Sequence, residues 1–355
     1  MKNGKTSSLP LRAGEWVQIR TKEEILRTLD ASGRLDELPF MPEMLQYCGM
    51  KMRVSKRAHK TCDPALGIGG RKMARAVHLE NIRCDGSAHD GCEASCLIFW
   101  KEAWLKRVDG ESAAGIAVSS RDEPSRNVKC TEDDLRLGVK VPASPGDPDP
   151  TYVCQNTQVK FATQPLPWWD VRQYLEDYTS GNVRLSQLAA GLLFSALRTV
   201  AEAGIGLGYA IRWTYDAFQR AIGGSPYPLR PYGVPQGTLT PKSQLNLQPG
   251  EIVRVKPYCE ILKTLNSDYR NRGMYFDAEM VLFTERGYKV HKRLKRVIDE
   301  RTSKMVHFKS DAIVLENVVC EARYAKCRRF CPRAIYPFWR EIWLERAHSV
   351  RDDKN

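Results

Sequence analysis

Cysteines carry the clearest chemical signal in this chain, because six of its eleven fall into two short groups. The members are Cys84, Cys92 and Cys96 in the first group and Cys320, Cys327 and Cys331 in the second. Thiolates hold a metal when three or four of them converge, and close spacing along the chain favours that convergence. The spacing therefore predicts two thiolate metal sites, one for each group.

A closed site needs a fourth ligand, and the sequence offers several. Cys62 is the candidate for the first group, and Cys154 is the candidate for the second. His89 lies inside the first group and is an alternative ligand there. The alternatives in the second half of the chain are Cys259, His291 and His307. A site with three cysteines and an open coordination position is the other arrangement that these residues allow.

The cysteine spacings also bear on the identity of the metal. Structural zinc sites usually contain Cys-x2-Cys pairs, which this chain lacks. Iron–sulfur clusters accept more varied spacings, so a [4Fe–4S] cluster at each site is favoured and zinc is the alternative. Small buried cysteines without metal are the third interpretation, since thiols often pack as apolar groups.

Three function classes follow from these interpretations. The favoured class is a metalloprotein that uses two iron–sulfur clusters in redox or cluster-dependent enzymatic chemistry. The alternatives are a zinc-stapled nucleic-acid-binding protein and an interaction scaffold with inert cysteines. No Ser-His-Asp, His-Glu-x-x-His or kinase-type set assigns a catalytic residue, so the sequence leaves open whether the protein is an enzyme.

The chain also repeats itself. Residues 11–84 align with residues 247–320 without a gap, and 22 of the 74 pairs are identical. Chance agreement would give roughly four or five. Each half then continues into its cysteine group and a matching segment, Phe99–Arg107 or Phe338–Arg346. The sequence thus predicts an internal duplication in which each copy carries its own cysteine site.

Alternation and helical spacing predict the elements of each copy. Residues 16–20 alternate like a half-buried strand, and residues 22–29 place their leucines and isoleucine on one helical face. Strand-like runs follow at 51–55 and 76–84, and the second copy repeats the pattern. These lengths predict an α+β fold in which each copy is a small β-barrel or SH3-like module.

A cysteine-bearing helix is expected to end each copy. The four-residue steps from Cys92 through Cys96 and Trp100 to Trp104 put these side chains on one helical face. The second copy shows the same step, although its prolines interrupt it.

Composition divides the chain into five segments. Residues 1–108 form the first copy and residues 245–350 the second. Between them we expect a polar insertion at 109–165, a helical bridge at 166–222 and a Pro/Gly linker at 223–244.

Charge and composition bear on partners and compartment. The net charge of +13 favours an anionic partner, either a nucleic acid or an acidic protein. Arg198 and Glu202 interrupt the longest apolar run, so we expect no transmembrane segment, while contact with a membrane surface stays open. Residues 1–12 lack an apolar signal region, and clustered cysteines suit a reducing compartment, which together predict a cytoplasmic location. The oligomeric state is not predicted.

Two glutamates form a pair of matching carboxylates in the two copies. Glu102 and Glu341 occupy equivalent positions in the two copies. Each lies near a basic residue, Lys106 or Arg340, so a surface salt bridge is the expected role.

Overall fold

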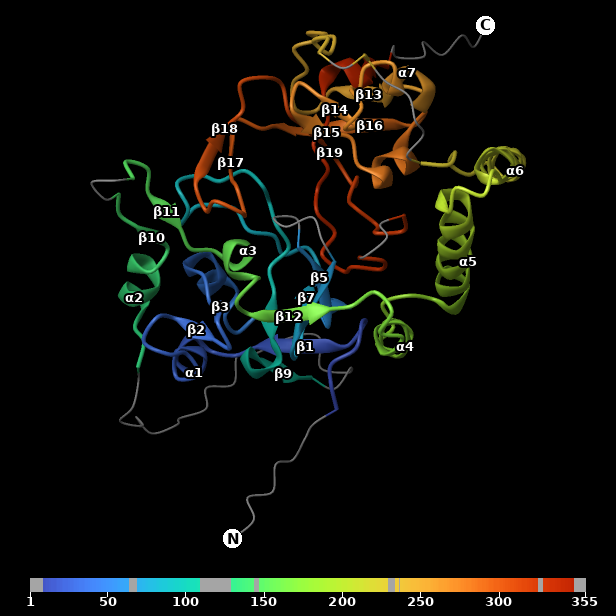
Figure 1. The fold of residues 1–355 in the computed structure, drawn as a ribbon. Coiled ribbons are helices and arrows are strands. Elements are labelled where there is room, and N and C mark those ends of the chain that lie inside the picture. The colour runs from blue at the N-terminus through green and yellow to red at the C-terminus, as the bar shows by residue number, and fades with distance from the viewer. Residues whose placement is uncertain are drawn as a thin grey trace, which may run out of the picture. The chain divides into compact units, whose positions relative to one another are not determined.

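A computed structural model describes residues 9–63, 69–108, 129–143, 147–228, 234–235, 237–324 and 328–347. The chain divides into two compact units (Figure 1). Unit 1 consists of Met1–Leu188, Ile298–Val306 and Phe330–Arg333, and unit 2 consists of Ala189–Val297, His307–Arg329 and Ala334–Asn355. Unit 1 therefore includes two short segments from the second half of the sequence.

The first half of the chain forms short strands joined by a few helical turns. The strands are β1 (Trp16–Ile19), β2 (Arg34–Leu35), β3 (Leu38–Pro39), β4 (Lys51–Arg57), β5 (Lys60–Cys62), β6 (Gly70–Met73), β7 (Ala76–Leu79), β8 (Trp100–Lys101), β9 (Leu105–Arg107), β10 (Lys140–Val141), β11 (Thr151–Tyr152) and β12 (Thr163–Leu166). The helices are α1 (Lys22–Leu26), α2 (Glu132–Leu137), α3 (Gln155–Gln158) and α4 (Arg172–Thr179), with 3-10 helices η1 (Pro42–Tyr47) and η2 (Glu102–Trp104).

The second half follows a similar order. The strands are β13 (Ile252–Val255), β14 (Arg270–Asn271), β15 (Met274–Tyr275), β16 (Gly287–Arg293), β17 (Arg296–Ile298), β18 (Met305–His307), β19 (Ile313–Leu315) and β20 (Leu344–Arg346). The helices are α5 (Leu185–Glu202), α6 (Gly208–Ala221) and α7 (Tyr258–Leu262), with 3-10 helices η3 (Ala278–Phe283) and η4 (Glu341–Trp343).

The main sheet of unit 1 is antiparallel, with the strand order β8-β7-β4-β1-β9. Val17 and Ile19 of β1 are buried, which fits the alternation of the sequence. Phe40 packs edge-on against Trp100 and Trp104, with ring centroids 6.2 and 5.2 Å apart. These aromatic rings fill the core beneath the sheet.

The main sheet of unit 2 has the order β19-β16-β13-β20, which matches four strands of the unit 1 sheet. Trp16 pairs with Arg53 between β1 and β4, and the aligned residues Ile252 and Lys289 pair between β13 and β16. Phe276 meets Trp339 and Trp343 at 6.1 and 5.2 Å, much as Phe40 meets its tryptophans. The aligned positions therefore pair alike in the two halves.

The mixed helix and sheet content agrees with the predicted α+β class, but two finer predictions of the fold were wrong. Among the described residues the sheets are small and open, and none closes into a barrel. The prediction of a cysteine-bearing helix was also wrong, since residues 92–99 form no helix and lead directly into β8 and η2. Ser95 has a φ of 48°, in the left-handed region that an α-helix excludes.

The region between the two copies contains more regular structure than its composition suggested. Residues 129–165 include α2, α3 and strands β10 and β11, and residues 166–222 include α4, α5 and α6. Thr131 and Asp134 form a capping box that begins α2, a signal that the polar composition concealed. No helix formed by the described residues is both long and apolar enough to span a bilayer.

The surface salt bridges expected for Glu102 and Glu341 were predicted with the wrong partners. Glu102 pairs with Arg75 at 3.1 Å. Glu341 is fully buried and pairs with Arg293 at 2.5 Å. Both partners come from neighbouring strands or turns, which spacing within a helix could not indicate.

Candidate metal centre

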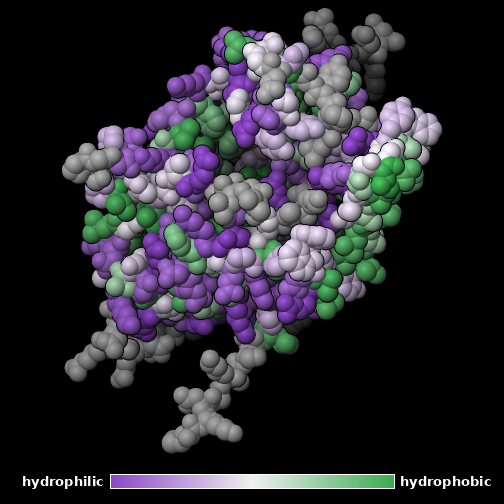
Figure 2. Space-filling model, viewed as in Figure 1, coloured by the Kyte–Doolittle hydropathy of each residue, from purple (hydrophilic) through white to green (hydrophobic). Residues whose placement is uncertain are grey.

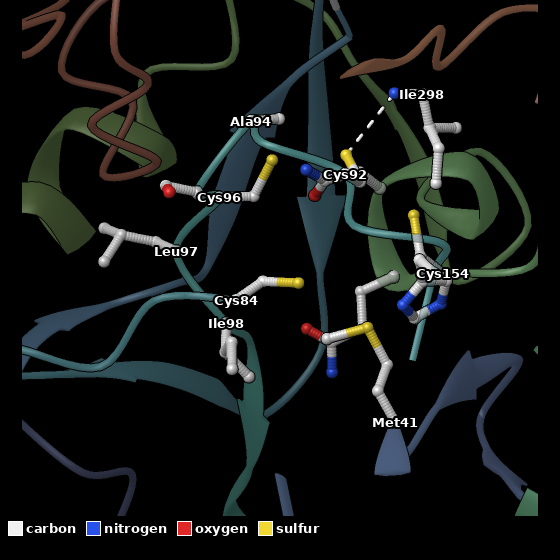
Figure 3. Close-up of a pocket in the computed structure, with 13 residues that line it drawn as sticks. Met41, Cys84, Cys92, Ala94, Cys96, Leu97, Ile98, Cys154 and Ile298 are labelled. Atoms are coloured by element: carbon white, nitrogen blue, oxygen red, sulfur yellow. Dashed lines mark hydrogen bonds between the residues drawn. The ribbon is translucent and has the colours of Figure 1, made fainter. Parts of the chain in front are cut away.

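Four cysteine thiols line one pocket of unit 1 (Figure 3). The pocket encloses about 370 Å³, part of it open to solvent. Its cysteines are Cys84, Cys92, Cys96 and Cys154. In the close-up their sulfur atoms surround a common space, and apolar side chains such as Met41 and Ile298 complete the wall. The pocket thus combines soft ligands with apolar surroundings.

Three of these cysteines lie on a loop whose shape is set by its backbone. The amide of Cys84 donates to the carbonyl of Cys96 over 2.8 Å, which joins the two ends of the loop. Gly86 has a φ of 73°, and a Cβ at this position would overlap the backbone of Cys92. Only glycine combines this conformation with so close an approach. The loop therefore folds back on itself and brings all three cysteines to one pocket without a helix.

Cys154 reaches the pocket from the N-terminus of α3, which it caps. Its amide donates to Thr157 Oγ1 over 3.0 Å, which begins the helical turn. The next residue, Gln155, is buried and holds this turn against the core, because its side chain accepts from the Phe99 amide and donates to the Phe99 carbonyl. Gln155 was not recognised from the sequence, which gives no signal for such a long-range pairing.

A backbone amide from the second half of the chain also reaches the pocket. Ile298 donates its N–H to Cys92 Sγ over 3.4 Å and lines the same cavity. Ile298 is the residue that aligns with Cys62 in the repeat. The position that holds a thiol in the first copy thus supplies an amide donor and an apolar side chain in the second. A hydrogen bond of this kind stabilises a thiolate and tunes a bound metal.

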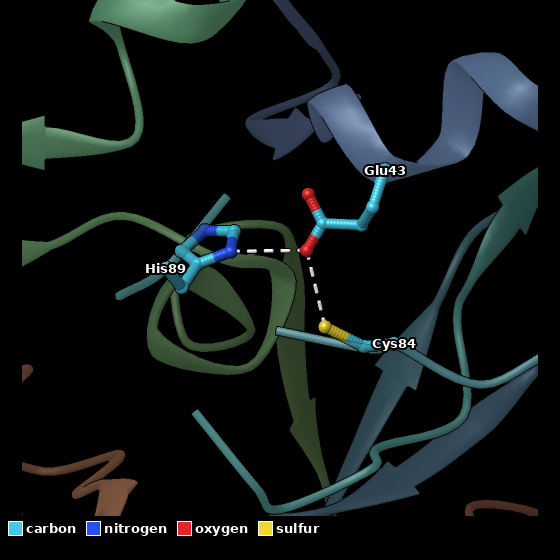
Figure 4. Close-up of side chains that lie close together, drawn as sticks. All are labelled: Glu43, Cys84 and His89. Carbon is cyan, nitrogen blue, oxygen red and sulfur yellow. Dashed lines mark hydrogen bonds and ion pairs between the residues drawn. The ribbon is translucent and has the colours of Figure 1, made fainter. Parts of the chain in front are cut away.

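Glu43, Cys84 and His89 form a hydrogen-bonded group beside the pocket (Figure 4). Their ligand atoms lie within 4.8 Å of one another. Cys84 Sγ donates to Glu43 Oε1 over 3.1 Å, and His89 Nδ1 lies 3.0 Å from the same oxygen. His89 Nε2 lies 3.1 Å from the carbonyl of Val153, which can only accept, so Nε2 carries a proton.

The protonation of this group follows from its contacts. Burial alone would lower the pKa of His89, but the hydrogen bond and the charge of Glu43 raise it above its ordinary value. Burial would likewise raise the pKa of Glu43, but His89 lowers it. Both ring nitrogens face acceptors, so an imidazolium paired with a carboxylate is the state that fits these contacts without a metal ion. In this state His89 positions the loop against Val153, the neighbour of Cys154.

Burial also determines the charge state of the pocket thiols. It raises the pKa of Cys154 to about 11, and it raises the pKa values of Cys84 and Cys96 further. Negative charge on Cys92 or Cys154 would raise the pKa of Cys96 further, because these thiols lie near it. Without a cation these three thiols hold their protons at neutral pH, and a bound metal would reverse that preference.

Cys62 and Cys331, which were assigned to different predicted sites, lie next to each other in unit 1. The amide of Cys62 donates to Cys331 Sγ over 3.1 Å. Arg333 is fully buried beside them, donates to the carbonyl of Cys62 over 3.3 Å and pairs with Glu300 at 2.6 Å. The carboxylate of Glu300 raises the pKa of Arg333 despite its burial, so it stays charged.

The remaining predicted ligands are dispersed. Cys320 lies in unit 2, where its amide donates to the carbonyl of Ile335. Cys327 lies outside the described residues. Cys259 is exposed on α7, and His291 stacks on Tyr336. His307, the last of the alternatives, is exposed at the end of β18.

Glu43 is the residue of this candidate site that the sequence analysis missed although a signal was available. It is one of the identities between the copies, aligned with Glu279. Both glutamates are buried, and Glu279 accepts from the amides of Arg323 and Tyr324. A buried carboxylate at aligned positions of both halves, inside a mostly apolar segment, indicates a fixed hydrogen-bonding role.

Comparison with protein-family models, with curated proteins and with solved structures gave no match.

Proposed function

We propose that this protein binds a [4Fe–4S] cluster in the unit 1 pocket and uses it in electron transfer. The ligands are Cys84, Cys92, Cys96 and Cys154. The observation that carries the proposal is that these four thiols line one pocket, although Cys154 is far from the other three in sequence. Buried inert cysteines have no reason to converge in this way, whereas cluster ligands must.

The spacing of the thiols favours a cluster over a single zinc ion. Zinc–sulfur bonds of about 2.3 Å put the thiolates of a tetrahedral site about 3.8 Å apart. Among the described residues, the three ligand atoms that come within 4.8 Å of one another belong to Glu43, Cys84 and His89, a group with one thiol only. In a cluster each thiolate binds a different iron, so wider separations are expected.

The number of ligands favours electron transfer over catalysis at iron. Four thiolates occupy the outer position of all four irons, so none is open to a substrate. Apolar side chains such as Met41 and Ile298 keep the pocket poor in water, and the Ile298 amide donates to Cys92. Burial and hydrogen bonds to sulfur are the features by which proteins set the reduction potential of a cluster.

The second thiolate site remains a prediction from the sequence. Its triplet is divided between the two units, and Cys327 lies outside the described residues. We also propose that the two halves of the chain arose by duplication of one module. The shared strand order and the matching register of β1–β4 and β13–β16 support this origin.

Metal analysis of protein purified without oxygen tests the proposed function. We expect iron and acid-labile sulfide in equal amounts, about four of each if only the described pocket is loaded, together with broad visible absorption. Cys154→Ser should lose most of this iron, because serine replaces one of the four ligands. Cys130→Ser is the matched control, since Cys130 is also buried but does not line the pocket.

Each other outcome has a defined meaning. Stoichiometric zinc in a colourless sample would show that the pocket is a zinc site and would contradict the proposed cluster. Absence of any metal, with unchanged stability of Cys154→Ser, would leave the thiols as packing groups and contradict the proposal. If Cys154→Ser kept its iron and Cys62→Ser lost it, Cys62 would be identified as the fourth ligand in place of Cys154.

A further inference from the structure

Helix α6 and most of helix α5 lie in unit 2, and both helices expose an unusual amount of apolar surface. α5 buries only Phe194 and Ala201 among its described side chains, and α6 buries none of its own. Large apolar side chains between 58% and 81% exposed occur along both helices and the turn that joins them. They include Leu193, Ile205, Tyr209, Trp213, Phe218 and Ile222, which we call the α5–α6 surface.

Only a small part of the surface of α5 is buried against the rest of unit 2. Phe194 contacts the rings of Tyr215, Tyr227 and Tyr324, with centroids 4.8–5.7 Å away. Figure 2 shows hydrophobic side chains running along the outer side of this helix. A helix that is apolar around most of its circumference normally lies inside a protein or in lipid. Exposed apolar area of this extent therefore indicates a binding surface.

Charge is distributed unequally between the two units. Unit 2 contains 25 Lys and Arg against 15 Asp and Glu, a net charge of +10 of the chain's +13. The acidic residues of α5 and α6 are engaged locally, because Glu202 pairs with Arg198 at 2.6 Å and Asp216 accepts from the Tyr227 amide at 2.7 Å. The α5–α6 surface thus belongs to the strongly basic unit, and its partner should be anionic as well as apolar.

The turn between the helices and the first residues of α6 have the composition of a segment that enters a lipid interface. Residues 203–211 contain no charged side chain, and Ile205 and Tyr209 are among the most exposed apolar residues of the molecule. Tyr209 and Trp213 are of the two types enriched at the level of lipid headgroups. Apolar and aromatic residues beside basic charge are typical of segments that lie in a membrane surface without crossing it.

We propose that the α5–α6 surface docks on a bilayer containing anionic phospholipid. Its apolar side chains enter the interfacial layer, and the basic charge of unit 2 attracts the headgroups. A nucleic acid would satisfy the charge but leave the apolar side chains in water. A second copy of the chain would cover the apolar side chains, but it would bring together two units that each have a net charge of +10 and therefore repel each other. The proposal does not depend on the metal centre.

Vesicle sedimentation with the full-length protein tests this proposal. Vesicles of equal parts phosphatidylglycerol and phosphatidylcholine should bind the protein, pure phosphatidylcholine should bind it more weakly, and added salt should weaken binding. The double variant Trp213→Ser with Phe218→Ser should bind about tenfold more weakly or worse, because two interfacial anchors are lost. Trp16→Ser is the matched control, since Trp16 is 42% exposed on β1 in unit 1.

The opposite results are equally clear. No sedimentation with anionic vesicles, or equal binding by the double variant and the wild type, would overturn the proposal. A lipid-free dimer in light scattering that the double variant converts to monomer would assign the surface to a second copy instead. Unchanged iron content in the double variant would confirm that any loss of binding does not come from the metal centre.

Discussion

Gly86 determines at the residue scale whether the cysteine loop can close. Its φ of 73° is accessible to other residues only with strain, and a Cβ would meet the backbone of Cys92. Glycine is therefore required here by both conformation and space.

Alanine at position 86 should abolish the metal centre. Gly86→Ala must push Cys92 away from Cys84 and Cys96, so we expect loss of most bound iron. Gly49→Ala is the control, because Gly49 has a φ of 80° but nothing within 4 Å of the added Cβ. Gly49→Ala should lose only about 1 kcal/mol of stability and keep its iron. Equal iron in both variants, measured per folded chain, would contradict the role of Gly86.

Glu43 and His89 show why the ligand set could not be chosen from residue type. His89 has the right chemistry and a position inside the cysteine group, but both of its ring nitrogens face hydrogen-bond acceptors. Glu43 holds one nitrogen and the Val153 carbonyl holds the other. The sequence therefore indicates His89 as a candidate ligand, and only the structure shows that both of its ring nitrogens already have hydrogen-bond partners.

At the scale of elements, Glu102 and Glu341 occupy aligned positions but make different numbers of hydrogen bonds. Glu102 accepts from one backbone amide, that of Leu11, and pairs with Arg75, whose side chain is 49% exposed. Glu341 accepts from the amides of three successive residues, 245–247, and from Arg293. Glu341 thus holds the segment before β13 against η4. Glu102 makes fewer hydrogen bonds, and its basic partner is more exposed.

Neutralising the two glutamates should therefore have different effects. Burial would raise the pKa of Glu341, but the three amides and Arg293 lower it below its ordinary value of 4.5. Its stabilising contribution is then present above pH 4.5 and is lost as the pH falls through the lowered pKa. We expect Glu341→Gln to cost about 3 kcal/mol and Glu102→Gln about 1 kcal/mol at neutral pH.

Urea unfolding of the two variants measures this difference. The gap between Glu341→Gln and the wild type should also narrow in acid, since the wild-type carboxylate is then protonated. Equal shifts of the midpoint for Glu102→Gln and Glu341→Gln would show that the two positions are energetically equivalent after all.

At the scale of the whole molecule, unit 1 is completed by segments of the second half. Residues 298–306 and 330–333 belong to it. Ile298 lines the cysteine pocket, and Arg333 is buried beside Cys62 with its charge balanced by Glu300. The unit that contains the first copy therefore also includes later segments, which the sequence repeat does not indicate.

A fragment that ends at Leu188 should fold poorly and bind little metal. It lacks the Ile298 amide and the Arg333 side chain, and it exposes the apolar wall that Ile298 covers. We expect lower iron content than in the full chain and binding of a hydrophobic dye, both measured on anaerobically purified protein. Full iron content in the fragment would show that the later segments are dispensable.

The sequence by itself determined the local features of this protein. Short cysteine spacing, the ungapped repeat and the alternation of strands all depend on neighbours along the chain, and they indicated the α+β class and the first three thiols of the pocket. The pairing of Trp16 with Arg53 and of Ile252 with Lys289 could be expected to match, because aligned residues face similar partners.

Only the tertiary structure decided which residues complete the pocket. Cys154 lines it, whereas Cys62 lies beside Cys331, and Ile298 reaches it from the second half. The open sheets and the irregular cysteine loop were likewise decided there. The physical reason is that these contacts join residues far apart in sequence. Their formation depends on how loops pack over a shared core, which spacing and composition do not encode.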